Sequence, residues 1–158
     1  MRRPFGNRPV AGVSISNVPV DDGRCFACGP DNPIGLHLHF DRSGAQSAHA
    51  RITLPADFQG WKDVAHGGIA MALLDEAMAH AAAAAGFRGM TASLTTRFRN
   101  PVPLEKPLDI RGEVLWIRRN VLSLRGQVFE AEKLLVEGEG RFVSKGRIDD
   151  VDDRRSRE

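Results

Sequence analysis

Hydrophobic and polar residues alternate along six stretches of the chain, as they do in β-strands that pack one face against a core. The clearest stretch is LHLHFD, residues 36–41, in which every second side chain from the first onward is apolar. Ser43-Gly44, just after it, suggests a hairpin turn into the second stretch. We therefore expect six antiparallel strands, at residues 36–41, 45–54, 90–100, 107–119, 121–131 and 134–145.

One long stretch, residues 65–86, is apolar without alternation and consists mostly of small residues. It predicts a helix over residues 67–85 that ends near Gly86, after a loop with one short helical turn. A helix that is apolar nearly all round must be buried on most sides. The predicted fold class is α+β, with a curved antiparallel sheet wrapped around one long central helix. A second copy of the chain would cover what one sheet leaves exposed, so we expect a homodimer.

Three polar residues, Asp75, Glu76 and His80, interrupt the middle of this apolar helix. They argue against a membrane-spanning segment, although the helix approaches the length of one. A buried carboxylate is costly unless another interaction offsets the cost. Glu76 lies four residues before His80, which is ion-pair spacing on a helix. That spacing gives Glu76 a structural explanation and leaves Asp75 as the stronger catalytic candidate.

The composition is that of an ordinary soluble globular domain: 158 residues, 42% apolar and 27% charged. A net charge of +2 is too weak a bias to indicate nucleic-acid binding. With two cysteines and no visible secretory signal, a reduced cytoplasmic setting is expected. We expect a poorly ordered segment at residues 1–24, one domain over 25–146 and a charged, frayed tail at 147–158.

Cys25 and Cys28 form a CxxC motif that is followed by His37 and His39. Four such side chains could in principle bind zinc. A second CxxC would strengthen that interpretation, and the sequence has none. A His-x-His pair on a strand is often only part of a polar face. We therefore expect packed free thiols, in preference to a metal site or a redox pair.

Three segments carry a family resemblance. HGG at residues 66–68 is followed by an acidic residue nine positions after its histidine, and MTASLTTRFRNPVPL at 90–104 is a threonine-containing strand that closes on NPVPL. CFACGPDNPIGLHLHF at 25–40 is the third segment. Together they resemble the PaaI-like, 4-hydroxybenzoyl-CoA-thioesterase-type branch of the hotdog-fold thioesterases, over roughly residues 25–146.

The resemblance implies a hotdog dimer, often paired into tetramers, that hydrolyses acyl-CoA thioesters. Coenzyme A is then part of the substrate, and no separate cofactor is implied. The resemblance also implies that Asp75 is the catalytic carboxylate, Gly67 an oxyanion donor and Thr91 a polar partner. One position departs from the pattern. Some relatives carry Asn or Gln six residues before the motif histidine, where this chain has Gly60, with Gln59 beside it.

The positions on the helix suggest how such a site would be assembled. Asp75 lies seven residues after Gly68, so the two share a face but stand about 10 Å apart along the axis. Across a two-fold axis, Asp75 of one chain would meet the His66-Gly67-Gly68 end of the other. There the helix N-terminal amides would stabilise an oxyanion, and the carboxylate would act as base or nucleophile. Alternatively, Asp75 is a capped or solvent-touching carboxylate, and the glycines only permit a tight turn.

The other candidate residues have two interpretations each. His66 would orient the thioester carbonyl or hold its loop. Thr91 would hydrogen-bond the attacking water or the carboxylate, although threonine is also common in strands. Arg97, Arg99 and Asn100 would contact the phosphates of coenzyme A or form a solvated basic edge.

Three functions fit a domain of this kind. The first is an acyl-CoA thioesterase, favoured because Asp75 is present. The second is a module that binds acyl-CoA without cleaving it. The third is a hotdog enoyl-CoA hydratase, which needs a histidine placed with an acidic residue around the acyl chain. The HGG motif followed by Asp75 does not match that arrangement well.

Overall fold

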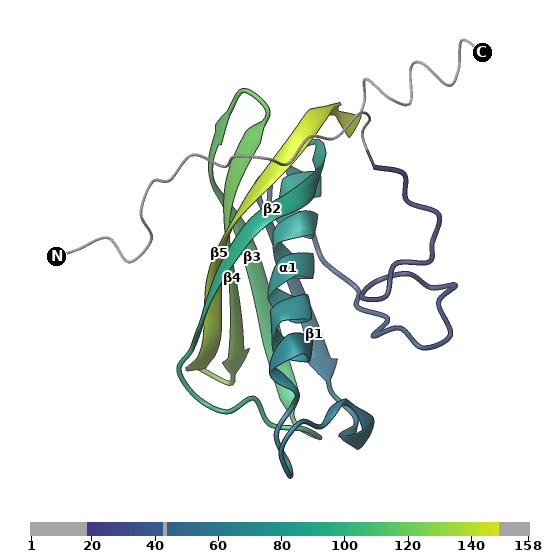
Figure 1. Cartoon of the computed structure of the whole chain (residues 1–158), viewed down its shortest axis with the longest axis vertical. Coiled ribbons are helices and arrows are strands. Elements are labelled where there is room, and N and C mark those ends of the chain that lie inside the picture. The colour runs from purple at the N-terminus through teal and green to yellow at the C-terminus, as the bar shows by residue number, and fades with distance from the viewer. Residues whose placement is uncertain (1–18, 43, 149–158) are drawn as a thin grey trace, which may run out of the picture.

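A computed structural model describes residues 19–42 and 44–148. The segments that we expected to be poorly ordered or frayed lie largely outside these residues. One long helix and five strands form the domain (Figure 1). The elements in chain order are β1 (Ser47–Thr53), the short 3-10 helix η1 (Ala56–Phe58), α1 (Gly67–Ala84), β2 (Phe87–Phe98), β3 (Pro107–Arg118), β4 (Val121–Glu130) and β5 (Lys133–Arg147).

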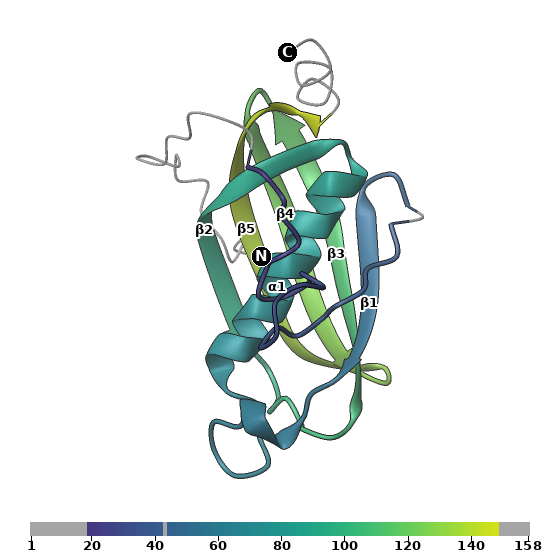
Figure 2. The same ribbon diagram turned by 90° about the vertical axis from the view of Figure 1, so that its right-hand side faces the viewer.

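The five strands form one antiparallel sheet in the order β1-β3-β4-β5-β2. The sheet curves along one side of α1, and residues 19–40 cross the opposite side of the helix (Figure 2). This arrangement confirms the predicted α+β architecture of a curved sheet around one central helix. Within the described residues, β1 and β2 are the edges of the sheet, so the strand that follows α1 has one unpaired side.

The predicted strand at residues 36–41 is wrong. Leu36 and Leu38 are buried as the alternation indicates, but their amides donate to the carbonyl oxygens of a turn at residues 26–27. Only Asp41 reaches the sheet, through an isolated bridge to β1. The alternation therefore reports only that every second side chain is buried. Here these side chains belong to a loop that covers α1 and not to a strand of the sheet.

The remaining elements follow the prediction, with boundaries that shift by a few residues. β2 begins at Phe87, three residues earlier than expected, and η1 is the short helical turn predicted before the long helix. Among the described residues, no helix combines the length and the apolar character needed to cross a membrane.

The core lies between α1 and the sheet. Leu73, Leu74 and Met78 of α1 are fully buried against the strands. Gly112 in β3 permits this close packing, because a Cβ there would lie 2.0 Å from the carbonyl oxygen of Ala77. The flank of α1 beside β2 is not covered in this way, and it carries the candidate site.

Candidate active site

Asp75 lies in the middle of α1 and points toward β2, where Thr91 meets it. The Thr91 hydroxyl donates a hydrogen bond of 2.6 Å to Oδ1 of Asp75. The pairing of β2 with β5 is irregular between Thr91 and Ser93. Such irregularities redirect side chains and are common beside active sites. The structure therefore brings together the two residues that the sequence placed sixteen positions apart.

The environment of Asp75 makes its carboxylate a stronger base than an ordinary aspartate. Partial burial raises its pKa, the hydrogen bond from Thr91 opposes that rise, and the charge of Glu76 adds to it. The net effect is a pKa above the usual value. Burial disfavours the charged form, whereas a donated hydrogen bond stabilises it. A perturbed carboxylate of this kind is typical of a functional site.

His66 caps the N-terminus of α1. Its Nδ1 accepts a hydrogen bond of 2.9 Å from the amide of Gly68. This contact corrects the expectation that both glycine amides are free to bind an oxyanion, because the Gly68 amide is already paired. Within the described residues, the amide of Gly67 has no acceptor. The helix start thus offers one free backbone donor at Gly67, at the positive end of the helix dipole.

Gly67 is exposed, and nothing among the described residues requires a glycine there. A Cβ at Gly67 would lie 3.6 Å from the Phe98 ring, which is ordinary contact. Gly67 and Asp75 share one side of α1 but lie eight residues apart, or about 12 Å along the axis. A single chain therefore does not place both groups on one reacting bond.

Gln59 and Gly60, at the position that departs from the family pattern, lie in the loop before α1. Gln59 uses its side-chain oxygen to accept a hydrogen bond of 2.9 Å from the amide of Asp63. A Cβ at Gly60 would approach Cα of His66 to 3.0 Å, because the loop folds back on itself. Both residues therefore have a structural part in shaping the loop that leads to His66.

The three residues proposed for coenzyme A phosphates lie at the end of β2 and just beyond it, near the start of α1. Arg99 Nε donates to Glu137 at 2.9 Å, and the Asn100 amide donates to the carbonyl oxygen of Leu134 at 2.8 Å. Arg97 is exposed. Asn100 and Arg99 are thus engaged with β5, a role that their sequence positions did not reveal.

Glu76 points away from Asp75, into a different set of contacts. His80 Nε2 lies 3.1 Å from Oε1 of Glu76, so the pairing predicted from their spacing is present. Burial alone would raise the pKa of Glu76, but hydrogen bonds from His80, Cys28 and Cys25 lower it below the usual value. The contact between the two cysteines and this carboxylate is not predicted by the sequence. The CxxC motif is the available signal, but the nearest ligand-type residues that follow it in the sequence are His37 and His39.

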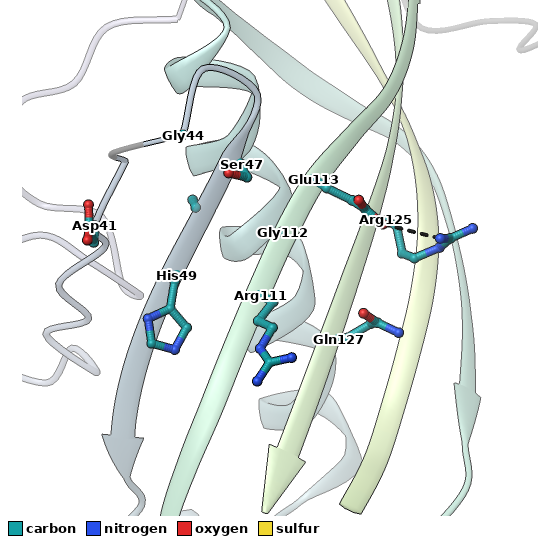
Figure 3. Close-up of a pocket in the computed structure, with 10 residues that line it drawn as sticks. Asp41, Gly44, Ser47, His49, Arg111, Gly112, Glu113, Arg125 and Gln127 are labelled. Atoms are coloured by element: carbon teal, nitrogen blue, oxygen red, sulfur yellow. Dashed lines mark hydrogen bonds and ion pairs between the residues drawn. The ribbon is translucent and has the colours of Figure 1, made fainter. Parts of the chain in front are cut away.

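Two cavities of the described residues lie away from Asp75. One, of about 320 Å³, is on the outer face of the sheet, where Arg111, Glu113 and Arg125 project from β3 and β4 on the side opposite α1 (Figure 3). The other, of about 510 Å³, lies over Glu76 and His80. Neither contains Asp75 or Gly67. Asp75 therefore lies outside both of these cavities, on the flank of α1 beside the β2 edge.

Comparison with known proteins identifies the architecture. The family described as Thioesterase superfamily matches residues 62–137. A solved thioesterase superfamily protein has a TM-score of 0.73 and 28% identity, covering 83% of this chain and 68% of its own. No curated protein matches the chain.

Two further solved structures share the fold. A hypothetical thioesterase from Streptococcus pneumoniae TIGR4, solved with coenzyme A, has a TM-score of 0.66 and 15% identity, covering 70% of this chain and 90% of its own. Alanine mutants of that thioesterase, solved separately, replace an aspartate and a threonine. A mutant of the phenylacetic acid degradation protein PaaI from Thermus thermophilus has a TM-score of 0.63 and 23% identity, covering 68% of this chain and 93% of its own. These likenesses confirm the hotdog fold.

Proposed function

We propose that this chain hydrolyses an acyl-CoA thioester to a carboxylic acid and free coenzyme A, because residues 62–137 match the thioesterase superfamily and the chain has the hotdog fold. The observation that carries the proposal is the half-buried Asp75 with a raised pKa, held by the Thr91 hydroxyl at 2.6 Å. Coenzyme A enters as part of the substrate, so the reaction needs only water besides. The two free cysteines fit a reduced, cytoplasmic setting.

Asp75 would act in one of two ways. As a general base it takes a proton from the water that attacks the thioester carbon. As a nucleophile it attacks that carbon itself and forms an anhydride, which water then opens. In both cases the carbon–sulfur bond breaks and the coenzyme A thiolate leaves. Thr91 would hold the carboxylate in position. Single turnover in ¹⁸O-water tests the nucleophile route, which places label in the Asp75 carboxyl group when water opens the anhydride at the Asp75 carbonyl. The general-base route places label only in the product acid.

The developing oxyanion needs a donor that is already in place. We assign this role to the free amide of Gly67 from the partner chain, because Gly67 of the same chain lies too far from Asp75 along α1. His66 and Gly68 would position the helix start through their hydrogen bond of 2.9 Å. Arg97, next to Phe98, would lie nearest the phosphates of coenzyme A.

A homodimer, which can pair into a dimer of dimers, is part of this proposal. Three apolar side chains on the flank of α1 and on β2 are exposed in the single chain: Met71 at 37%, Met90 at 50% and Phe98 at 51%. The free edge of β2 lies beside them. Large apolar groups next to an unpaired strand are typical of a surface that a second copy covers.

Two comparisons support the substrate class. The Streptococcus pneumoniae thioesterase was solved with coenzyme A, and a Streptococcus mutans UA159 protein of the same fold was solved with acetyl CoA. The aspartate and threonine that were mutated in the former are separated by the same number of residues as Asp75 and Thr91.

The test is a panel of acyl-CoAs with a thiol-reactive dye, run on the wild-type chain and on Asp75→Asn. Thiol release should be seen for the wild type and fall at least about 10²-fold in Asp75→Asn, the usual worth of a general base. Asp109→Asn, on the sheet and away from the site, is the matched control and should keep full activity.

Other outcomes of the same panel would contradict the proposal. Tight binding without thiol release indicates an acyl-CoA-binding module. A change at the double bond of an enoyl-CoA indicates a hydratase. Normal turnover in Asp75→Asn would show that the wrong carboxylate was chosen.

A further inference from the structure

A cluster of ligand-type side chains lies on the side of α1 that the proposed hydrolysis does not use. Cys25 Sγ lies 3.7 Å from both carboxylate oxygens of Glu76. One ligand atom from each of Cys25, Cys28 and Glu76 falls within 4.8 Å of the other two. The residues come from two segments about 50 positions apart, so the fold and not the local sequence brings them together.

The turn that carries the two cysteines has a fixed shape. The Gly29 amide donates to the Cys25 carbonyl oxygen at 2.8 Å. A Cβ at Gly29 would lie 2.4 Å from the Cys25 nitrogen and 2.5 Å from the Gly23 oxygen, so only glycine fits there. Ala27, inside the turn, is buried. The turn is therefore anchored in the core, and it presents both sulfur atoms to α1.

A second layer of contacts orients the Glu76 carboxylate. The guanidinium of Arg42 donates to Nδ1 of His80, from Nε at 2.9 Å and from Nη2 at 2.7 Å. Because a guanidinium only donates, Nδ1 is an acceptor and the other ring nitrogen carries the proton. That nitrogen, Nε2, then donates to Glu76 at 3.1 Å. Phe40 stacks on the His80 ring with centroids 4.4 Å apart. Carboxylates that bind metals are typically held by such outer contacts.

The charges of the cluster favour a cation. Two thiolates and a carboxylate at these distances would place three negative charges together. A divalent ion would offset that charge, because thiolates and carboxylates are ligands of thiophilic cations.

We propose that Cys25, Cys28 and Glu76 bind a thiophilic divalent cation of the zinc class. Zinc–sulfur bonds of about 2.3 Å and zinc–oxygen bonds of about 2.0–2.2 Å fit ligand atoms at these separations after small side-chain shifts. The fourth position of a tetrahedral ion would face the cavity of about 510 Å³, which Arg24 and Arg88 also line. The sequence predicts no metal site, because it lacks a second CxxC and a His-x-His pair is often only part of a polar face. In the folded chain His37 and His39 are both exposed, and Glu76 lies beside the cysteines instead.

Cobalt titration of the reduced, chelator-treated full chain tests the site. We expect one Co²⁺ per chain, with a thiolate-to-cobalt charge-transfer band that added Zn²⁺ removes. Fewer than one ion per chain, no charge-transfer band, or a Cys25–Cys28 disulfide that forms in place of binding would overturn the proposal.

Variants locate the ligands. Cys28→Ser and Glu76→Gln should abolish one-to-one binding, and His80→Ala should weaken it about 10- to 100-fold, as loss of an outer contact does. The double variant His37→Ala/His39→Ala is the control and should bind like the wild type. Circular dichroism establishes that each variant is folded. If Cys28→Ser does not fold, the near-isosteric Glu76→Gln decides alone, and unchanged binding in either folded variant would refute the assignment.

Discussion

Replacing Thr91 with valine should reduce turnover and shift its pH dependence while leaving the fold intact. The change keeps the shape of the side chain and removes only the hydroxyl that donates to Asp75 at 2.6 Å. Thr91 is exposed on an edge strand, and valine suits strands well, so little stability should be lost.

The expected magnitude follows from that hydrogen bond. A hydrogen bond to a charged group is worth about 1.5–3 kcal/mol, and solvent at this exposed position favours the lower end. Since about 1.4 kcal/mol corresponds to a tenfold change in rate, kcat/KM should fall about tenfold. The Thr91 hydrogen bond opposes the rise in the Asp75 pKa, so its loss should raise that pKa further. The acidic limb of the rate profile should therefore move to higher pH.

The assay is the pH dependence of kcat/KM for thiol release, with Thr95→Val as the matched control. Thr95 is an exposed threonine four residues further along β2. Thr95→Val should keep the wild-type rate and profile. If Thr91→Val also kept both, the Thr91–Asp75 contact would have no part in catalysis. A fall in rate with no movement of the acidic limb would contradict the role of Thr91 in setting the Asp75 pKa.

Three further predictions concern stability. Asp75→Asn should raise the melting temperature at neutral pH, because an acid whose pKa is raised in the folded state destabilises that state once ionised; an unchanged or lower value would contradict the burial cost. Glu76 has a lowered pKa, so its ionised carboxylate stabilises the fold above the usual pKa of 4.5, and that stability is lost as the pH falls through the folded-state pKa. In denaturant unfolding of the metal-free chain, the free energy of unfolding of Glu76→Gln should therefore depend less on pH in the acid range than that of the wild type. An identical pH dependence would contradict the stabilising role of Glu76. Thr96→Val should stabilise the chain by about 1 kcal/mol, because Thr96 Oγ1 is buried without a hydrogen-bond partner among the described residues. A lower melting temperature for Thr96→Val would contradict this prediction.

Periodicity alone predicts most of this fold. The unbroken apolar stretch around residues 67–85 became α1, and four alternating stretches after it became the sheet strands. The same reasoning failed at residues 36–41, because alternation reports which side chains are buried and not which backbone they pair with. That segment bonds to the turn at residues 26–27, a contact set by tertiary packing.

The site was predictable only as far as local spacing reaches. The Glu76–His80 contact follows from helical geometry, four residues apart. The pairing of the Gly68 amide with His66 depends on the side-chain rotamer at the cap, which no pattern encodes. The approach of Cys25 to Glu76 joins segments that are distant in the sequence. Contacts of the last kind need the folded chain, and they carry the inference that the sequence alone did not support.

The shared site can be tested by mixing two inactive variants. Asp75→Asn lacks the carboxylate, and Gly67→Val blocks approach to the free amide while its first side-chain atom fits beside Phe98. In a two-fold dimer with shared sites, a mixed dimer keeps one intact site, so random exchange of equal amounts should restore about a quarter of wild-type activity. Native mass spectrometry establishes that mixed dimers have formed. If they are present and no activity is recovered, the site is not built from Asp75 of one chain and Gly67 of the other.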